Sequence, residues 1–349
     1  MTGRGSLLVR RRRHRTGSAD GHGGGDGRDG RNGHDRRDGR NGRDGAQVME
    51  RPSFSSYYGL PVIRAPRWER RDIASYLFLG GLAGGSSTLA LAEWLRRGDG
   101  ALVRNGELAA VGAIGLSTAA LVHDLGRPAR FANMLRVCKP TSPMSVGSWL
   151  LAVYGPLSGV AAGARLTGRA HRLGAIGRIG AGVLGPAVAA YTAVLLADTA
   201  VPAWHDARRE LPAVFTASAA MAAGGTALVT TGGAACRPAQ RFALAGAAGE
   251  LLALEVLRKR AGLAAEAYRR GDARRFLRTG RALALSGVVA AVAARRHRGL
   301  RVAAGALLTA ASACTRFGVF SAGVISAEDP RFVVEPQRSR LEAETAANR

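Results

Sequence analysis

The chain has 349 residues, of which 50 are lysine or arginine and 25 are aspartate or glutamate, giving a formal net charge of +25. Charge and apolarity are segregated along the sequence, which argues against an ordinary soluble basic protein. The only cysteines are Cys138, Cys236 and Cys314, which lie far apart without a CxxC pair. This spacing argues against a disulfide framework, an iron–sulfur cluster, a thiolate zinc site and covalently attached haem.

The first 50 residues form a compositionally distinct segment with 13 glycines, 12 arginines and 6 aspartates. The octapeptide DGRDGRNG at 26–33 is nearly repeated at 38–45. Because so little apolar surface is available to offset the entropy of ordering, we predict a disordered basic tail over residues 1–55. No aromatic residue interrupts Arg10–Arg13, so contact with anionic lipid is favoured over nucleic-acid binding.

Eight apolar stretches follow, and each is typical of a helix that crosses a bilayer. They are rich in Ala, Leu and Gly without strand-like alternation, which excludes a lipid-facing barrel. A span needs about 20 apolar residues, whereas the second and sixth stretches have 16 and the seventh has 13, so seven spans remain the alternative to eight. The stretches are Ile73–Leu95, Leu108–His123, Val146–Ala164, Ile179–Ala197, Leu211–Thr231, Phe242–Leu257, Ala282–Ala294 and Val302–Ile325.

The predicted fold is therefore an all-α, polytopic transmembrane bundle of about eight spans over residues 56–328, followed by a C-terminal tail at 329–349. Glycines of GGLAGGSS at 80–87 recur at a spacing of four and predict close helix packing. Arginines at both ends of the seventh stretch can reach the interface and let it span. Loops on the side of the termini carry 15 Lys and Arg against 13 on the other side, which favours cytoplasmic termini.

Polar residues gather where the second stretch ends, in HDLGRPARF at 123–131. Gly126 and Pro128 stop the helix, which leaves His123, Asp124, Arg127 and Arg130 at the membrane boundary. An alternative reading is that Asp124 only pairs with Arg127 and caps the loop. Ser142 and Pro143 then open the next helix as its N-cap and first residue.

Ionisable residues within the apolar stretches are unfavourable in lipid and therefore informative. Arg316 and Glu250 lie in the middle of their stretches, Asp198 closes the fourth and Glu93 lies near the end of the first. A buried Arg316–Glu250 ion pair is favoured over a proton route. Among the seven histidines only His123 touches a predicted span, which argues against haem held by two intramembrane histidines.

Several segments in order resemble the NrfD / polysulfide reductase membrane-subunit family, over about residues 57–340. The resemblance is closest to an actinobacterial branch that accompanies formate dehydrogenases. The segments are YLFLGGLAGGSS (76–87), DLGRPARFANMLRV (124–137), SPMSVGSW (142–149), YTAVLLADTAVPAWH (191–205), TRFGVF (315–320) and DPRFVVEPQR (329–338).

The resemblance implies a helical anchor in the cell membrane without haem, cluster, metal site or catalytic residue of its own. Such an anchor exchanges electrons between menaquinone or another quinone and an iron–sulfur subunit, which serves a molybdenum or tungsten catalytic subunit.

The resemblance also implies positions for a quinone site. Tyr191 matches the tyrosine of a family motif associated with the quinone pocket, although Ala193 replaces the usual glycine. Trp68 and Tyr76 match the aromatic start of the first helix, and His123 and Asp124 match the polar end of the second. The loop motif carried over by resemblance comprises Arg127, Pro128, Arg130, Ser142 and Pro143.

Two other functions stay open at this point. A transporter or ion channel would show inverted repeats with helices broken at mid-membrane. A purely structural anchor would hold a soluble dehydrogenase without touching quinone. The residues that separate a quinone-reactive subunit from such an anchor are Tyr191, His123 and Asp124.

Overall fold

The computed structural model of the protein describes residues 62–63, 70–98, 100–125, 133–232, 236–294 and 297–348. The predicted basic tail at 1–55 lies outside these residues. The chain divides into two units, Met1–Pro52 and Ser53–Arg349, and all described residues belong to the second.

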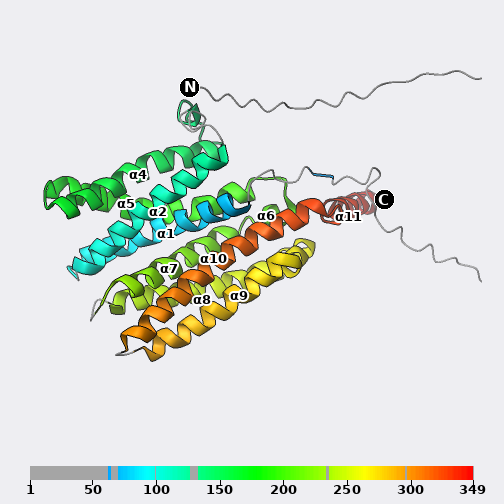
Figure 1. Ribbon diagram of the computed structural model, residues 1–349. Helices are drawn as coiled ribbons and strands as arrows, with labels where there is room; N and C mark the ends of the chain where they lie inside the picture. The colour runs from blue at the N-terminus through cyan, green and yellow to red at the C-terminus, as the bar shows by residue number, and fades with distance from the viewer. Residues whose placement is uncertain are drawn as a thin grey trace, which may run out of the picture. The chain divides into compact units, whose positions relative to one another are not determined.

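Every regular element within these ranges is helical, so the all-α prediction is confirmed (Figure 1). Long helices alternate in direction and lie side by side, whereas two short helices and a terminal one lie at an end of the bundle. The elements are α1 Arg70–Leu95, α2 Gly100–Leu125, α4 Pro143–Thr167, α5 His171–Ala197, α6 Pro202–Asp206, α7 Leu211–Thr230, α8 Cys236–Arg260, the 3-10 helix η2 Gly262–Arg269, α9 Gly271–Ala293, α10 Arg298–Glu328 and α11 Arg331–Ala347.

Seven helices of the described chain are long and apolar enough to cross a membrane, which is the count that the sequence analysis kept as the alternative to eight. The long helix that does not meet this length and composition requirement is α8, the expected sixth span. The short seventh stretch does meet it. Although α8 has 25 residues, charged side chains at both ends and two internal glutamates interrupt its apolar stretch. The seventh stretch passes because its helix, α9, begins at Gly271, well before the expected start.

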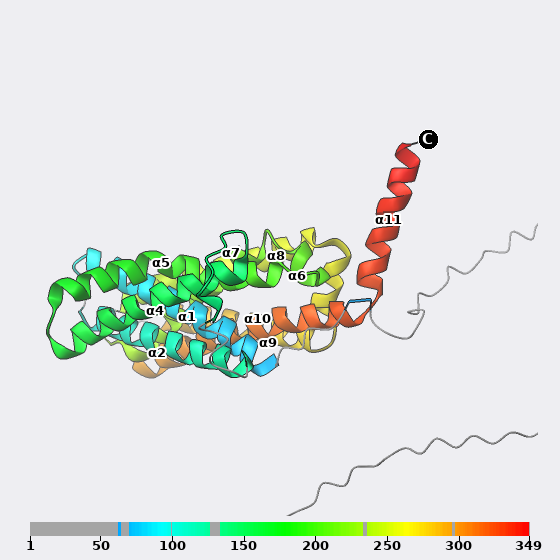
Figure 2. The same ribbon diagram turned by 90° about the horizontal axis from the view of Figure 1, so that it is seen from above.

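The helices pack so that α1 contacts α2, α5 and α7, while α7 also contacts α8 and α10. Helix α4 lies against α5, and α9 lies against α10 (Figure 1). Helices α1, α4, α7 and α9 begin at the end of the bundle where α6, η2 and α11 lie. We call this the α11 end (Figure 2). The other end is called the opposite end below.

Gly84 and Gly85 of α1 lie where neighbouring helices approach closely, as the spacing predicted. A Cβ on Gly84 would overlap the carbonyl of Gly185 on α5. A Cβ on Gly85 would come within 2.6 Å of the carbonyl oxygen of Ala219 on α7. Adjacent glycines thus let α1 contact two helices through backbone, which small residues permit inside a membrane.

The substitution Gly84→Ala is expected to destabilise the bundle, because the added methyl forces the backbones of α1 and α5 apart. Overpacking of this kind costs about 1–3 kcal/mol of unfolding free energy. Unfolding of the purified protein by SDS in mixed micelles measures the difference. The matched control is Gly112→Ala on α2, where no atom lies within 4 Å of an added Cβ. Equal midpoints for the two variants would contradict the expected role of Gly84.

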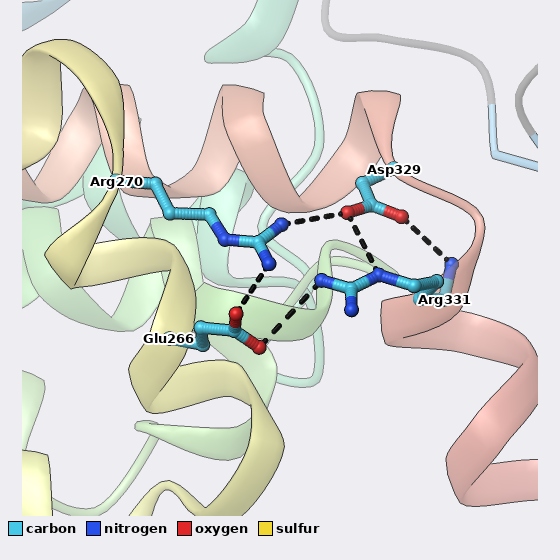
Figure 3. Close-up of polar contacts among 4 residues, drawn as sticks. All are labelled: Glu266, Arg270, Asp329 and Arg331. Carbon is cyan, nitrogen blue, oxygen red and sulfur yellow. Dashed lines mark hydrogen bonds and ion pairs between the residues drawn. The ribbon is translucent and has the colours of Figure 1, made fainter.

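The C-terminal segment expected as a tail is helical from Arg331 to Ala347. Asp329, between α10 and α11, accepts hydrogen bonds from Arg270 at 2.9 Å and from Arg331 at 3.2 Å. Glu266 of η2 forms ion pairs with the same two arginines (Figure 3). This network ties η2 to the start of α11, and it gives the DPRFVVEPQR segment a structural role.

Candidate functional site

Two tyrosines predicted separately, Tyr76 and Tyr191, meet near the α11 end. Tyr76 lies on α1 and is 2% exposed, whereas Tyr191 lies on α5 and is partly exposed. Their side chains lie close enough to interact with each other. A phenol hydroxyl can both donate and accept a hydrogen bond, so the two tyrosines together offer a donor to a further acceptor.

Small residues make room for this pair. The ring of Tyr191 lies directly on Gly147 of α4, where any Cβ would overlap the ring. Ser117 of α2 donates a hydrogen bond to the Tyr76 carbonyl at 3.2 Å. A Cβ on Gly80 would find only ordinary contacts, 3.5 Å from the Ser117 hydroxyl and 3.8 Å from Thr192. Four helices therefore contribute to one polar region near the end of the bundle.

An Asp72–His123 pair lies close to the tyrosines along the bundle. His123 Nδ1 is 2.6 Å from the Asp72 carboxylate, and the two side chains are 75% and 22% exposed. Asp72 precedes Tyr76 by one turn of α1, a rise of about 6 Å. The sequence analysis placed Asp124 beside His123 and overlooked Asp72, whose position just before the first apolar stretch was the only signal.

The other predicted positions fall into three groups. Asp198 caps α5 as an exposed residue at the α11 end, and Glu93 is buried near the opposite end. Ser142 and Pro143 occupy the expected N-cap and first position of α4, although the Ser142 hydroxyl makes no capping hydrogen bond. The remaining predicted positions, Trp68, Arg127, Pro128 and Arg130, lie outside the described residues.

Glu250 and Arg316 are both buried, at 1% and 0% exposure, and interact electrostatically. Their hydrogen bonds run to other groups. Thr315 donates to Glu250 at 2.8 Å, and Arg316 donates to the Phe215 carbonyl at 2.7 Å. The guanidinium also lies 3.7 Å from the centre of the Phe215 ring. The two charged side chains are therefore neighbours, but their hydrogen bonds are to Thr315 and Phe215 and not to each other.

A buried charged cluster at the opposite end escaped the sequence analysis. Glu107 of α2 is 3% exposed and accepts from Arg178 of α5 at 2.5 Å and from Arg165 of α4 at 3.3 Å. The Arg178 guanidinium also lies over the Trp94 ring, 5.0 Å from its centre. The cluster borders a cavity of about 500 Å³. Arg178 and Tyr191 are separated by about 20 Å along α5, so the cluster and the tyrosine pair occupy different ends.

Aromatic residues also secure the α11 end. Trp204 is fully buried and donates to the Val319 carbonyl at 2.9 Å, and Tyr268 donates to the Ala203 carbonyl at 2.8 Å. Burial, together with the negative charges of Asp206 and Glu210, raises the pKa of Tyr268, so its hydroxyl stays protonated and keeps donating. These bonds fix α6 to α10 and η2 to α6 at the α11 end of the bundle.

The comparisons with known proteins agree with this arrangement. Residues 68–237, about half of the chain, match the family model described as Polysulphide reductase, NrfD. No curated protein matches the chain. The matched range contains both tyrosines, the Asp72–His123 pair and the Glu107 cluster, and it ends at the start of α8. Together with the seven apolar helices, the match identifies a multi-pass membrane protein. Over residues 68–237, the chain belongs to the NrfD family, whose members are membrane subunits of polysulphide reductase-type oxidoreductases.

Proposed function

We propose that the protein is a quinone-reactive membrane subunit, which passes electrons between an iron–sulfur subunit and the quinone pool of the cell membrane. The observation that carries this proposal is that Tyr76 and Tyr191, from two different helices, interact near the α11 end. A quinone headgroup needs donors for its carbonyl oxygens and a source of protons near a membrane face. The tyrosines supply the donors, and the imidazole of His123, paired with Asp72, supplies a group that can take up and release a proton.

In this function menaquinone or another quinone takes up two electrons from the partner subunit and two protons from the protein. Tyr191 holds one quinone oxygen through its hydroxyl, and Tyr76 orients Tyr191. His123, which is paired with Asp72, transfers protons from the solvent side to the quinone. Asp124 is the next residue after His123 on α2. These electrons come from a molybdenum or tungsten catalytic subunit of formate dehydrogenase type. A catalytic subunit of polysulfide reductase type would instead receive electrons from the reduced quinone through the same chain. We also propose that both chain termini face the cytoplasm, since α8 runs along the bundle as well and α1 begins at the end where α10 finishes.

The substitution Tyr191→Phe tests the proposal, because it removes one hydroxyl while the ring stays on Gly147. In the assembled complex, quinone reduction is expected to fall at least about tenfold, which corresponds to ~1.4 kcal/mol of barrier. Electron transfer from the catalytic subunit to an artificial acceptor should survive. The matched control is Tyr154→Phe, which removes a buried hydroxyl that is hydrogen-bonded to Ser87 at 3.0 Å.

Replacement of Tyr76 by Phe, or of His123 by Gln, should slow the same step. If quinone reduction is unchanged in all three variants while the complex stays assembled, the subunit is a structural anchor or its quinone site lies elsewhere.

The proposal assigns the redox groups to other chains. Purified by itself, the protein is therefore expected to show no haem Soret band and no iron–sulfur signal in electron paramagnetic resonance. Co-purification with mass spectrometry identifies the partner chains. A stoichiometric haem in the isolated subunit would refute the assignment.

A further inference from the structure

A cavity of about 650 Å³ lies between the end of α8, η2 and the first half of α9. It is outside the part of the chain that matches the family. One carboxylate lines it, that of Glu255, together with apolar atoms of Leu277, Ala282 and Leu285. The cationic side chains of the lining are Arg258, Lys259, Arg269, Arg274, Arg278 and Arg281.

The positive charge of this cavity is poorly compensated. Glu255 approaches Arg258 and Lys259 at only 3.9 Å each, in the weak range of exposed ion pairs. Burial, followed by the like charge of Arg281, lowers the pKa of Arg258. An anion among these side chains would relieve their mutual repulsion.

The cationic cavity continues directly into exposed apolar surface. On α9, Arg278 and Arg281 share one helix face with Leu285, Val289 and Val292, whose exposures are 47%, 68% and 56%. On α8, Leu252 and Val256 are 68% and 40% exposed. Helix α8 packs mainly on α7, and helix α9 packs mainly on α10. Helices α8 and α9 make few contacts with each other. An apolar surface therefore extends along both helices, away from the charges.

We propose that this cavity binds the headgroup of an anionic phospholipid, whose acyl chains lie along the exposed apolar faces of α8 and α9. The positive charges favour a phosphate group. The exposed apolar surface on α8 and α9 next to them favours a ligand that also has acyl chains over an acidic protein surface. Basic pockets between membrane helices are suited to such headgroups. Arg258 and Arg281 belong to different helices, so a shared phosphate joins α8 to α9 at the membrane boundary.

Native mass spectrometry of the full chain in mild detergent tests the site with phosphatidylglycerol and phosphatidylcholine as probes. The wild-type protein should retain phosphatidylglycerol in preference to phosphatidylcholine. The double variant Arg258→Gln, Arg281→Gln should bind phosphatidylglycerol about thirtyfold more weakly. The control Arg172→Gln, Arg209→Gln removes two exposed arginines elsewhere and should bind like the wild type. Inorganic phosphate in large excess should not displace the lipid, since it lacks the acyl chains.

Equal retention of both lipids, or unchanged binding by the double glutamine variant, would overturn the proposal. Displacement by inorganic phosphate would do so too, because it would reveal a site for free anions. Should the glutamine variant fail to fold, a photoactivatable phosphatidylglycerol with the wild-type chain decides. Crosslinks within residues 252–292 are expected, and crosslinks confined to other helices would overturn the proposal.

Discussion

Replacing Glu107 by Gln is expected to destabilise the bundle by about 3–5 kcal/mol, because it removes the one carboxylate shared by two arginines. Glu107 and Arg178 are 3% and 8% exposed, so the guanidinium left behind has little access to water. Arg165, at 30% exposure, can turn toward solvent and contributes less. The effect should therefore arise mainly from the Arg178 partner.

SDS-induced unfolding of the purified protein measures this loss. The control Glu255→Gln removes a carboxylate that is 51% exposed and pairs at 3.9 Å, so it should change stability by at most about 1 kcal/mol. The double variant Glu107→Gln, Arg178→Met should recover much of the loss, since no unpaired buried charge remains. If Glu107→Gln unfolds like the control, the cluster does not hold α2 to α5.

This cluster was not predicted because the sequence reveals the apolar middle of each span more clearly than the residues at which its helix begins and ends. It began the second and fourth spans at Leu108 and Ile179, one residue after Glu107 and one residue after Arg178. In the structure α2 begins at Gly100 and α5 at His171, so both charges lie on helices and face each other. A charge next to an apolar stretch is acceptable inside a bundle when a neighbouring helix supplies its partner.

The same distinction explains the span count. The seventh stretch seemed too short because the arginines of α9 were taken as its border, although the helix continues through them. The sixth stretch seemed acceptable because its apolar centre was scored without the charges around it. Helix α8 is long enough to be a span, but its composition is too polar. It lies beside α7 and buries one of its charged residues, Glu250.

Tyr76 and Tyr191 were predicted as candidates because each matched a motif of the resembled family on its own helix. Their contact was not predictable, since 115 positions separate them and no local pattern states that α1 packs against α5. Asp72 was missed for a related reason. Its partner His123 is 51 residues away, and only the antiparallel packing of α1 and α2 brings the two side chains together.

The substitution Arg316→Met is expected to lower the free energy of unfolding by about 3–5 kcal/mol. We expect a similar loss for Glu250→Gln, because each substitution leaves a buried charge without its neighbour. Arg316 is fully buried where α1, α7 and α10 meet. It also loses its hydrogen bond to the Phe215 carbonyl and its contact with the Phe215 ring. SDS-induced unfolding of the single variants gives the two individual losses.

A double-mutant cycle then separates the electrostatic coupling from the individual hydrogen bonds. If the two charges stabilise each other, the double variant should lose less than the sum of the singles, by about 0.5–3 kcal/mol. Exchange of the charges, Glu250→Arg with Arg316→Glu, should recover only part of the stability. The Phe215 carbonyl accepts from a guanidinium but has nothing to offer a carboxylate, whereas the Thr315 hydroxyl is able to donate or to accept. Strictly additive losses would show that Glu250 and Arg316 act through their own neighbours and that no ion pair joins α8 to α10.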